Sequence, residues 1–162
     1  MKTQVVKRKH LKCLDKIMTG LGMFQQDNLR VKSDLTFLNQ VLQWFEKFCF
    51  QNLAKVSWLE NKYDGIKLAL AEGFTNAVRH AHENLPKETP IDIQVKLSEE
   101  GLEIRIWDFG EPFDPNTLPE PEPGTLQVGG YGWFLMRRIA DRVIYERGQD
   151  QRNCLILITG KV

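Results

Sequence analysis

The chain has 162 residues, which is enough for one domain with a sizeable hydrophobic core and hardly enough for two. Its 22 Lys and Arg residues nearly balance 21 Asp and Glu residues, so the net charge argues against nucleic acid or an anionic membrane as the main partner. The three cysteines show no metal-ligand spacing and no apolar run is long enough to span a bilayer, which disfavours a disulfide framework and predicts a cytoplasmic protein.

Residues 1–27 form a basic extension with only a weak apolar pattern, which fits an added strand and a loose helix equally well. Its role is open between an added strand, a dimer contact and a docking tail for a partner. Residues 28–162 contain no internal repeat and no linker. We therefore expect them to form one domain.

A first amphipathic helix is predicted after Ser33 and Asp34, either of which can cap its N-terminus. Apolar residues then recur at helical spacing from Leu35 to Phe48. One face of this helix should therefore be buried.

A second helix is predicted over residues 61–83. Its apolar residues form one buried stripe, which comprises Tyr63, Ile66, Leu70, Phe74, Ala77, Val78 and Ala81. Glu72, Asn76 and His80 lie outside this stripe at intervals of four, so they share one side of the helix. The helix can therefore pack on a sheet and still present polar groups to a cavity.

Strands and one further helix are predicted after this pair. Alternating apolar residues at 91–97 and 102–106 predict a β-hairpin. Five prolines crowd residues 111–128 and exclude a helix or a central strand there. Helical spacing resumes after Gly132, and two more strands are predicted at residues 143–146 and 154–159.

This order of elements predicts an α+β fold. It fits a two-layer sandwich in which helices cover one face of a mainly antiparallel, mixed sheet. The other face of the sheet would be open to water or to a partner.

The polar side of the second helix carries the first candidate chemistry. The Glu72 carboxylate can act as a base, and the Asn76 amide oxygen can coordinate Mg²⁺, which takes its remaining ligands from water and phosphates. Taken alone, this spacing more often marks a solvated polar edge. His80 is expected to be structural, at the border of the site.

Two further blocks contain glycine. Asp108 and Gly110 follow the second strand of the predicted hairpin, a place where an Asp and a Gly often only form a turn. The second block, Gly129, Gly130 and Gly132, opens a helix, where flexible backbone and free N–H groups favour an anion such as phosphate.

The three blocks in this order resemble the motifs of one superfamily, the Bergerat-fold (GHKL) ATPases. Residues 70–81, LAEGFTNAVRHA, resemble the N box. Residues 104–110, IRIWDFG, resemble the G1 box, and residues 129–135, GGYGWFL, resemble the G2 box. Within the superfamily the chain is similar to the small anti-sigma-factor serine kinases of bacteria, over residues from about 30 to the C-terminal end.

The resemblance implies ATP and Mg²⁺ as cofactors. Asp108 would accept a hydrogen bond from the adenine amine, and Gly110 would leave room for the base. Asn76 would hold Mg²⁺ against the phosphates. The phosphates would lie against the backbone N–H groups of Gly129, Gly130 and Gly132. Residues 111–128 would form a lid over them.

The resemblance also implies a protein serine/threonine kinase in which Glu72 accepts the proton of the attacking hydroxyl. Its partners would be an anti-sigma-factor antagonist, which it phosphorylates, and a sigma factor, which it sequesters. A homodimer is left open. Arg137 and Arg138 are candidates for a cation at the phosphates by their proximity to the G2 box.

Two other functions were weighed against the kinase. In the first, the protein is a switch module that binds ATP and exchanges partners without transferring phosphate, and Glu72 only orients the water around Mg²⁺. The presence of Glu72 favours the kinase. In the second, the chain is the catalytic part of a histidine kinase, which we disfavour because we expect no helical hairpin with a phosphoacceptor histidine before the site.

Overall fold

The computed structural model describes residues 22–119, 122 and 131–161, and the structural statements below concern this part of the chain. Its strands form one five-stranded sheet in the order β1-β2-β3-β5-β4. The strands are β1 Met23–Lys32, β2 Pro90–Ser98, β3 Gly101–Asp108, β4 Arg142–Arg147 and β5 Asn153–Gly160. The α-helices are α2 Leu38–Asn52, α3 Trp58–Asn76 and α4 Tyr131–Ile139.

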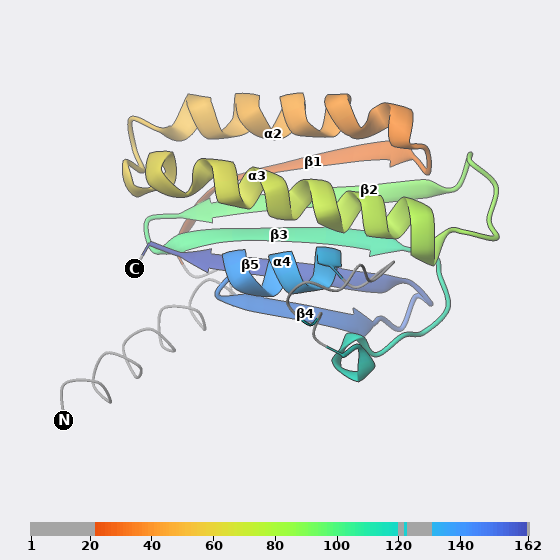
Figure 1. The fold of residues 1–162 in the computed structure, drawn as a ribbon. Coiled ribbons are helices and arrows are strands. Elements are labelled where there is room, and N and C mark those ends of the chain that lie inside the picture. The colour runs from red at the N-terminus through yellow and green to blue at the C-terminus, as the bar shows by residue number, and fades with distance from the viewer. Residues whose placement is uncertain (1–21, 120–121, 123–130, 162) are drawn as a thin grey trace.

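The helices α2, α3 and α4 lie on one face of the sheet (Figure 1). The predicted α+β class and its two-layer arrangement are therefore confirmed. All four strand pairings of the described sheet are antiparallel, so it lacks the parallel part that a mixed sheet would have. None of the helices in the described residues is both long and apolar enough to cross a membrane.

The edge strand β1 begins at Met23, so the boundary expected between residues 27 and 28 falls inside a strand. β1 pairs with β2 along its length, from Met23 opposite Ser98 to Lys32 opposite Pro90. The apolar pattern expected in the basic extension lies mostly in residues 1–21, outside the described residues.

The predicted hairpin is confirmed as β2 and β3, which pair from Asp92 opposite Trp107 to Leu97 opposite Leu102. Alternate residues of β2 are buried, beginning with Ile91 and Ile93. The two strands predicted near the C-terminus are confirmed as β4 and β5.

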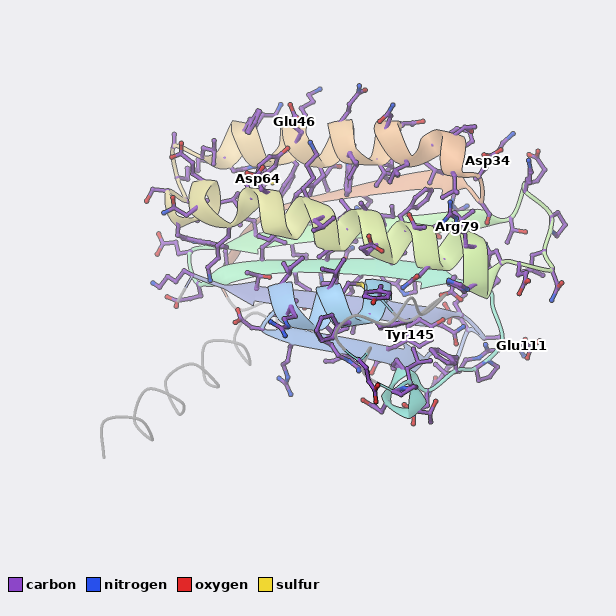
Figure 2. The ribbon with its side chains drawn as sticks, in the orientation of Figure 1. Asp34, Glu46, Asp64, Arg79, Glu111 and Tyr145 are labelled. Carbon is purple, nitrogen blue, oxygen red and sulfur yellow. The ribbon has the colours of Figure 1, made fainter. Side chains whose placement is uncertain are left out.

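The first predicted helix begins with a short 3₁₀ turn, Leu35–Phe37, that leads into α2. The Asp34 carboxylate accepts a hydrogen bond from the Thr36 N–H at 2.9 Å, which makes Asp34 the cap of this turn. Figure 2 shows Asp34 at the end of the helical layer where α2 starts.

Helix α3 packs closely on the middle of the sheet because Gly73 has no side chain. A Cβ atom at Gly73 would lie 2.8 Å from Cδ1 of Ile106 on β3 and 2.9 Å from Cδ2 of Leu155 on β5. The neighbouring Leu70 and Phe74 are fully buried in the same core. The helix backbone therefore lies directly against these two strands.

The second predicted helix does not run as one α-helix to residue 83. After Asn76 it continues as a π-helical turn, η2, Ala77–Ala81, in which the His82 N–H donates to the Ala77 carbonyl at 2.9 Å. A π turn takes one residue more than an α turn, so His82 faces inward where α-periodicity places Ala81. The expectation that Ala81 is a buried member of the stripe is wrong, since it is only half-buried.

We predict that Gly73→Ala lowers the free energy of unfolding by about 1 kcal/mol, because overpacking costs about 1–3 kcal/mol and exceeds a helix-propensity gain of about 1 kcal/mol. Gly65→Ala on the same helix is the control, since its Cβ would meet only Cγ2 of Ile139 at 3.3 Å. Urea denaturation measures both. Equal stabilisation by the two substitutions would contradict the close approach at Gly73.

Candidate functional site

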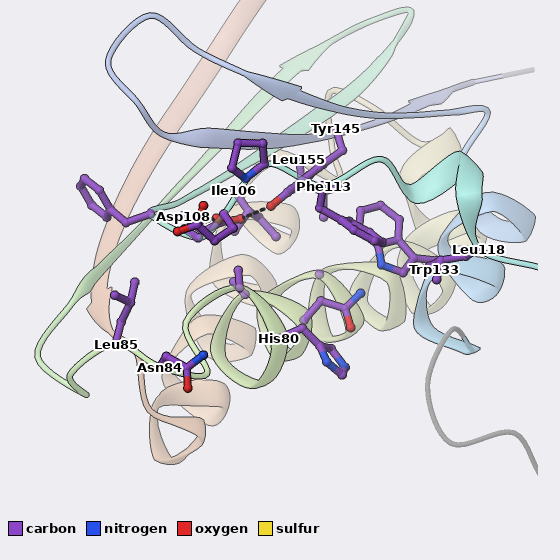
Figure 3. Close-up of a pocket in the computed structure, with 18 of the residues that line it drawn as sticks. His80, Asn84, Leu85, Ile106, Asp108, Phe113, Leu118, Trp133, Tyr145 and Leu155 are labelled. Carbon is purple, nitrogen blue, oxygen red and sulfur yellow. Dashed lines mark hydrogen bonds between the residues drawn. The ribbon is translucent and has the colours of Figure 1, made fainter.

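A cavity of about 770 Å³ opens between the C-terminal end of α3, the end of β3 and the start of α4. This volume lies in the range of small-molecule sites. Figure 3 shows its lining, in which polar groups face aromatic and apolar side chains. The lining includes Asn76, His80, Asp108, Gly110, Trp133 and Tyr145.

Asp108, the last residue of β3, is held in the cavity wall by three hydrogen bonds. Its Oδ2 accepts from the Tyr145 hydroxyl at 2.8 Å. Its Oδ1 accepts from the Asn153 amide at 2.9 Å and from the Gly110 N–H at 2.8 Å. A carboxylate has about four lone-pair positions, so this buried group keeps about one for a ligand.

Burial raises the pKa of Tyr145 far above its usual value, and the negative charge of Asp108 raises it further. The phenol therefore keeps its proton and remains a donor to Asp108. Tyr145 lies on β4, on the side of the sheet that α4 covers (Figure 2).

Gly110 lines the cavity, but the main reason that residue 110 must lack a side chain is its close approach to Ala81 in η2. A Cβ atom at Gly110 would lie 2.7 Å from the Ala81 carbonyl oxygen and 2.8 Å from the Ala81 Cβ. The Gly110 carbonyl accepts from Arg147 Nη1 at 2.8 Å and from the Asn153 amide at 3.0 Å. The turn after Asp108 is therefore fixed against both the helix and β5.

The first and third sequence blocks meet at Gly132. A Cβ atom on Gly132 would lie 2.8 Å from Oε2 of Glu72 and 3.3 Å from both amide atoms of Asn76. Asn76 Nδ2 is buried and has no hydrogen-bond partner in the described part of the chain. Such an orphaned amide beside a cavity fits a ligand that supplies the missing partner.

The remaining predicted site residues are placed as follows. Glu72 lies beside Gly132 and is not part of the cavity lining, whereas His80 lines the cavity and is exposed. Gly129 and Gly130 lie outside the described residues, as does most of the expected lid beyond Pro119.

Within the described part of the chain, the contacts of the two arginines proposed as a cation direct neither of them to the cavity. The Arg137 guanidinium donates to the Pro115 carbonyl at 3.0 Å and so holds the segment after β3 against α4. The Arg138 guanidinium lies over the Phe134 ring, 4.8 Å from its centroid.

Sequence reasoning missed an aromatic cluster in the cavity wall. The rings of Trp133 and Tyr145 have centroids 5.5 Å apart, and Phe113 lies 6.2 Å and 6.3 Å from them. The three residues belong to three different segments of the chain. No spacing in the sequence links them, so only the fold reveals the cluster.

A second missed residue is His82, which is 3% exposed. Its Nε2 accepts a hydrogen bond from the Phe109 N–H at 2.8 Å. Burial lowers the pKa of His82 and so favours the neutral imidazole, whereas the charge of Asp108 opposes this shift in part. The spacing of the three blocks contained no signal for this contact.

Comparison with known proteins gives a family match over most of the chain. The family model for the histidine kinase-like ATPase domain matches residues 31–159, which include all three sequence blocks. Among solved structures, the RsbU and RsbW domains of Rv1364c from Mycobacterium tuberculosis have a TM-score of 0.58 at 12% sequence identity. This likeness covers 84% of this chain and 32% of that chain, and it shows the same fold.

The curated relatives are serine-protein kinases named RsbW. The protein of Oceanobacillus iheyensis is 35% identical over 88 residues, which cover 49% of this chain and 55% of that protein. The protein of Bacillus licheniformis is 30% identical over 98 residues, which cover 56% of this chain and 61% of that protein. The match thus spans somewhat over half the length of each relative. The chain belongs to the histidine kinase-like ATPase family, whose nucleotide is ATP, and it is a distant homologue of the RsbW serine kinases.

Proposed function

We propose that this protein is an ATP-dependent serine/threonine protein kinase that phosphorylates an anti-sigma-factor antagonist and sequesters a sigma factor. The observation that carries the proposal is that Gly132 lies beside Glu72 and Asn76, at one side of a cavity that Asn76 and Asp108 line. The proposed base, the proposed metal ligand and the start of α4 thereby lie close together.

The end of the cavity at Asp108 suits adenine. The lone-pair position that Asp108 retains can accept a hydrogen bond from the 6-amine of adenine, whereas guanine has an oxygen there that a carboxylate repels. Trp133 and Tyr145 supply apolar wall area for a flat ring. These features support selection of ATP over GTP.

The end of the cavity at Asn76 suits phosphates and Mg²⁺. The start of α4 lies here, and the N-terminal end of a helix favours an anion. The Asn76 amide would hold Mg²⁺, and the glycines at 129, 130 and 132 would add backbone N–H groups around the phosphates. Bound ATP supplies the γ-phosphoryl group for transfer.

Glu72 is the proposed general base. It lies one helical turn before Asn76 and beside Gly132, which places a carboxylate near the proposed phosphate end. Its role is to accept the proton of a serine or threonine hydroxyl as that oxygen attacks. The name of the relatives, serine-protein kinase, supports a protein hydroxyl as the acceptor.

A second candidate function is a partner switch that binds ATP without transferring phosphate. One observation favours it, because Glu72 is not among the residues that line the cavity. In that function Glu72 would orient water around Mg²⁺. The two candidates differ in one measurable step, the transfer of phosphate to a protein.

We predict that Glu72→Gln lowers phosphate transfer by about 10²–10⁴-fold, the range for loss of a general base, and leaves ATP affinity unchanged. The assay combines labelled ATP with candidate antagonist proteins from the same genome. Asp64→Asn is the matched control, because Asp64 is an exposed acid near the other end of α3 (Figure 2).

Full transfer activity in Glu72→Gln would exclude Glu72 as the base. ATP binding by the parent protein with no labelled protein under any pairing would overturn the kinase proposal in favour of the switch.

The proposed metal site predicts that removal of Mg²⁺ with EDTA weakens ATP binding by the parent protein about tenfold or more. In Asn76→Ala the same treatment should change ATP affinity little, because the ligand is already missing. Asn84→Ala, an exposed amide in the same cavity, should behave as the parent does. Titration calorimetry measures all three. An undiminished EDTA effect in Asn76→Ala would rule out this ligand.

The hydrogen bond from Tyr145 to Asp108 predicts that Tyr145→Phe lowers ATP affinity about tenfold, the equivalent of ~1.4 kcal/mol for one bond to a charged group. Tyr63→Phe is the control, since Tyr63 donates to Glu46 at 3.3 Å between α2 and α3. The readout is ATP affinity by calorimetry. Equal losses in the two variants would show that Tyr145 acts only through overall stability.

A further inference from the structure

The π-helical turn after α3 determines where His82 lies. In a π turn the residue five positions on lies nearly below the first, so His82 falls under the buried Ala77. The hydrogen bond from the His82 N–H to the Ala77 carbonyl, at 2.9 Å, marks this turn directly. The extra residue therefore turns the imidazole inward, toward the end of β3.

The imidazole holds the first peptide that leaves the sheet. Asp108 is the last residue of β3 that pairs with β5, opposite Asn153, so the Phe109 N–H has no strand partner. His82 Nε2 accepts from that N–H at 2.8 Å. A backbone N–H can only donate, so Nε2 is unprotonated and the neutral ring carries its proton on Nδ1.

We propose that His82 is a positioning residue that sets the preference for adenine over guanine by fixing the peptide between Asp108 and Phe109. The proposal rests on the proposed role of Asp108 as the group that reads the base. Tyr145 and Asn153 hold the carboxylate from the sheet, and His82 holds the main chain from the helix.

One helical segment then relates the two ends of the site. Asn76 ends α3 and His82 caps the π-helical turn that follows it, six residues apart, so one helical segment carries both the group proposed to hold Mg²⁺ and the group that fixes the turn proposed to read the base. Without an acceptor at residue 82, the Phe109 N–H would be unpaired, and the peptide would turn to find one.

A displaced Asp108 affects the two bases differently. Its hydrogen bond to the adenine 6-amine weakens, and its repulsion of the guanine 6-oxygen weakens as well. ATP affinity therefore falls while GTP affinity does not fall with it. Loss of stability alone would lower both affinities by the same factor.

The experiment measures the affinities of the full chain for ATP and for GTP by titration calorimetry in four forms. These are the parent, His82→Leu, His82→Gln and His82→Asn. The glutamine amide oxygen reaches the position of Nε2, whereas the asparagine side chain is too short. Glu83→Gln is the matched control, since Glu83 is the exposed residue next to His82 and does not line the cavity.

We expect the ratio of ATP to GTP affinity to fall about tenfold in His82→Leu and His82→Asn, and to stay within about threefold of the parent in His82→Gln and Glu83→Gln. If His82→Leu does not fold, the contrast between glutamine and asparagine gives the same answer. An unchanged ratio in His82→Asn, or equal losses in the asparagine and glutamine variants, would overturn the proposal. A parent that binds ATP and GTP equally would instead refute the role proposed for Asp108.

Discussion

The structure depends on the close approach of one helix to the sheet. Two glycines make that approach, Gly73 against the side chains of β3 and β5, and Gly110 against the backbone of Ala81. At either position, a Cβ atom would lie less than 3 Å from its neighbours and would prevent so close an approach. Because the helical segment contacts both the sheet and the turn after β3, Asn76 on the helix and Asp108 on the strand line the same cavity. The proposed nucleotide site is therefore a consequence of packing between two elements that are far apart in the sequence.

Much of the fold was predictable because it rests on local patterns. The alternation from Ile91 to Leu97 and the turn after it predicted the hairpin that became β2 and β3. The three blocks were also informative in combination, since residues 31–159 match one ATPase family. Gly132 lies beside Glu72 and Asn76, which joins the first block to the third. The prediction of one regular α-helix over residues 61–83 failed after Asn76, however, because apolar periodicity does not reveal a single π turn.

The residues that hold Asp108 were not predictable, for a physical reason. Tyr145 and Asn153 reach it across 37 and 45 residues of sequence, through the register of β4 and β5. Hydrogen bonds of this kind follow from tertiary structure and leave no spacing pattern. His82 escaped notice in the same way, since α-periodicity assigns the inward position to its neighbour. The buried carboxylate itself is stabilised by three donors, which offset the cost of removing its charge from water.

The central claim is that one cavity takes ATP with its base at Asp108 and its phosphates at Asn76 and Gly132. A crystal structure of the full chain, grown with Mg²⁺ and a non-hydrolysable ATP analogue, tests it most directly. The account predicts the adenine 6-amine within hydrogen-bond distance of the Asp108 carboxylate, and the triphosphate beside the start of α4. A nucleotide bound in the reverse orientation, or outside this cavity, would contradict the account.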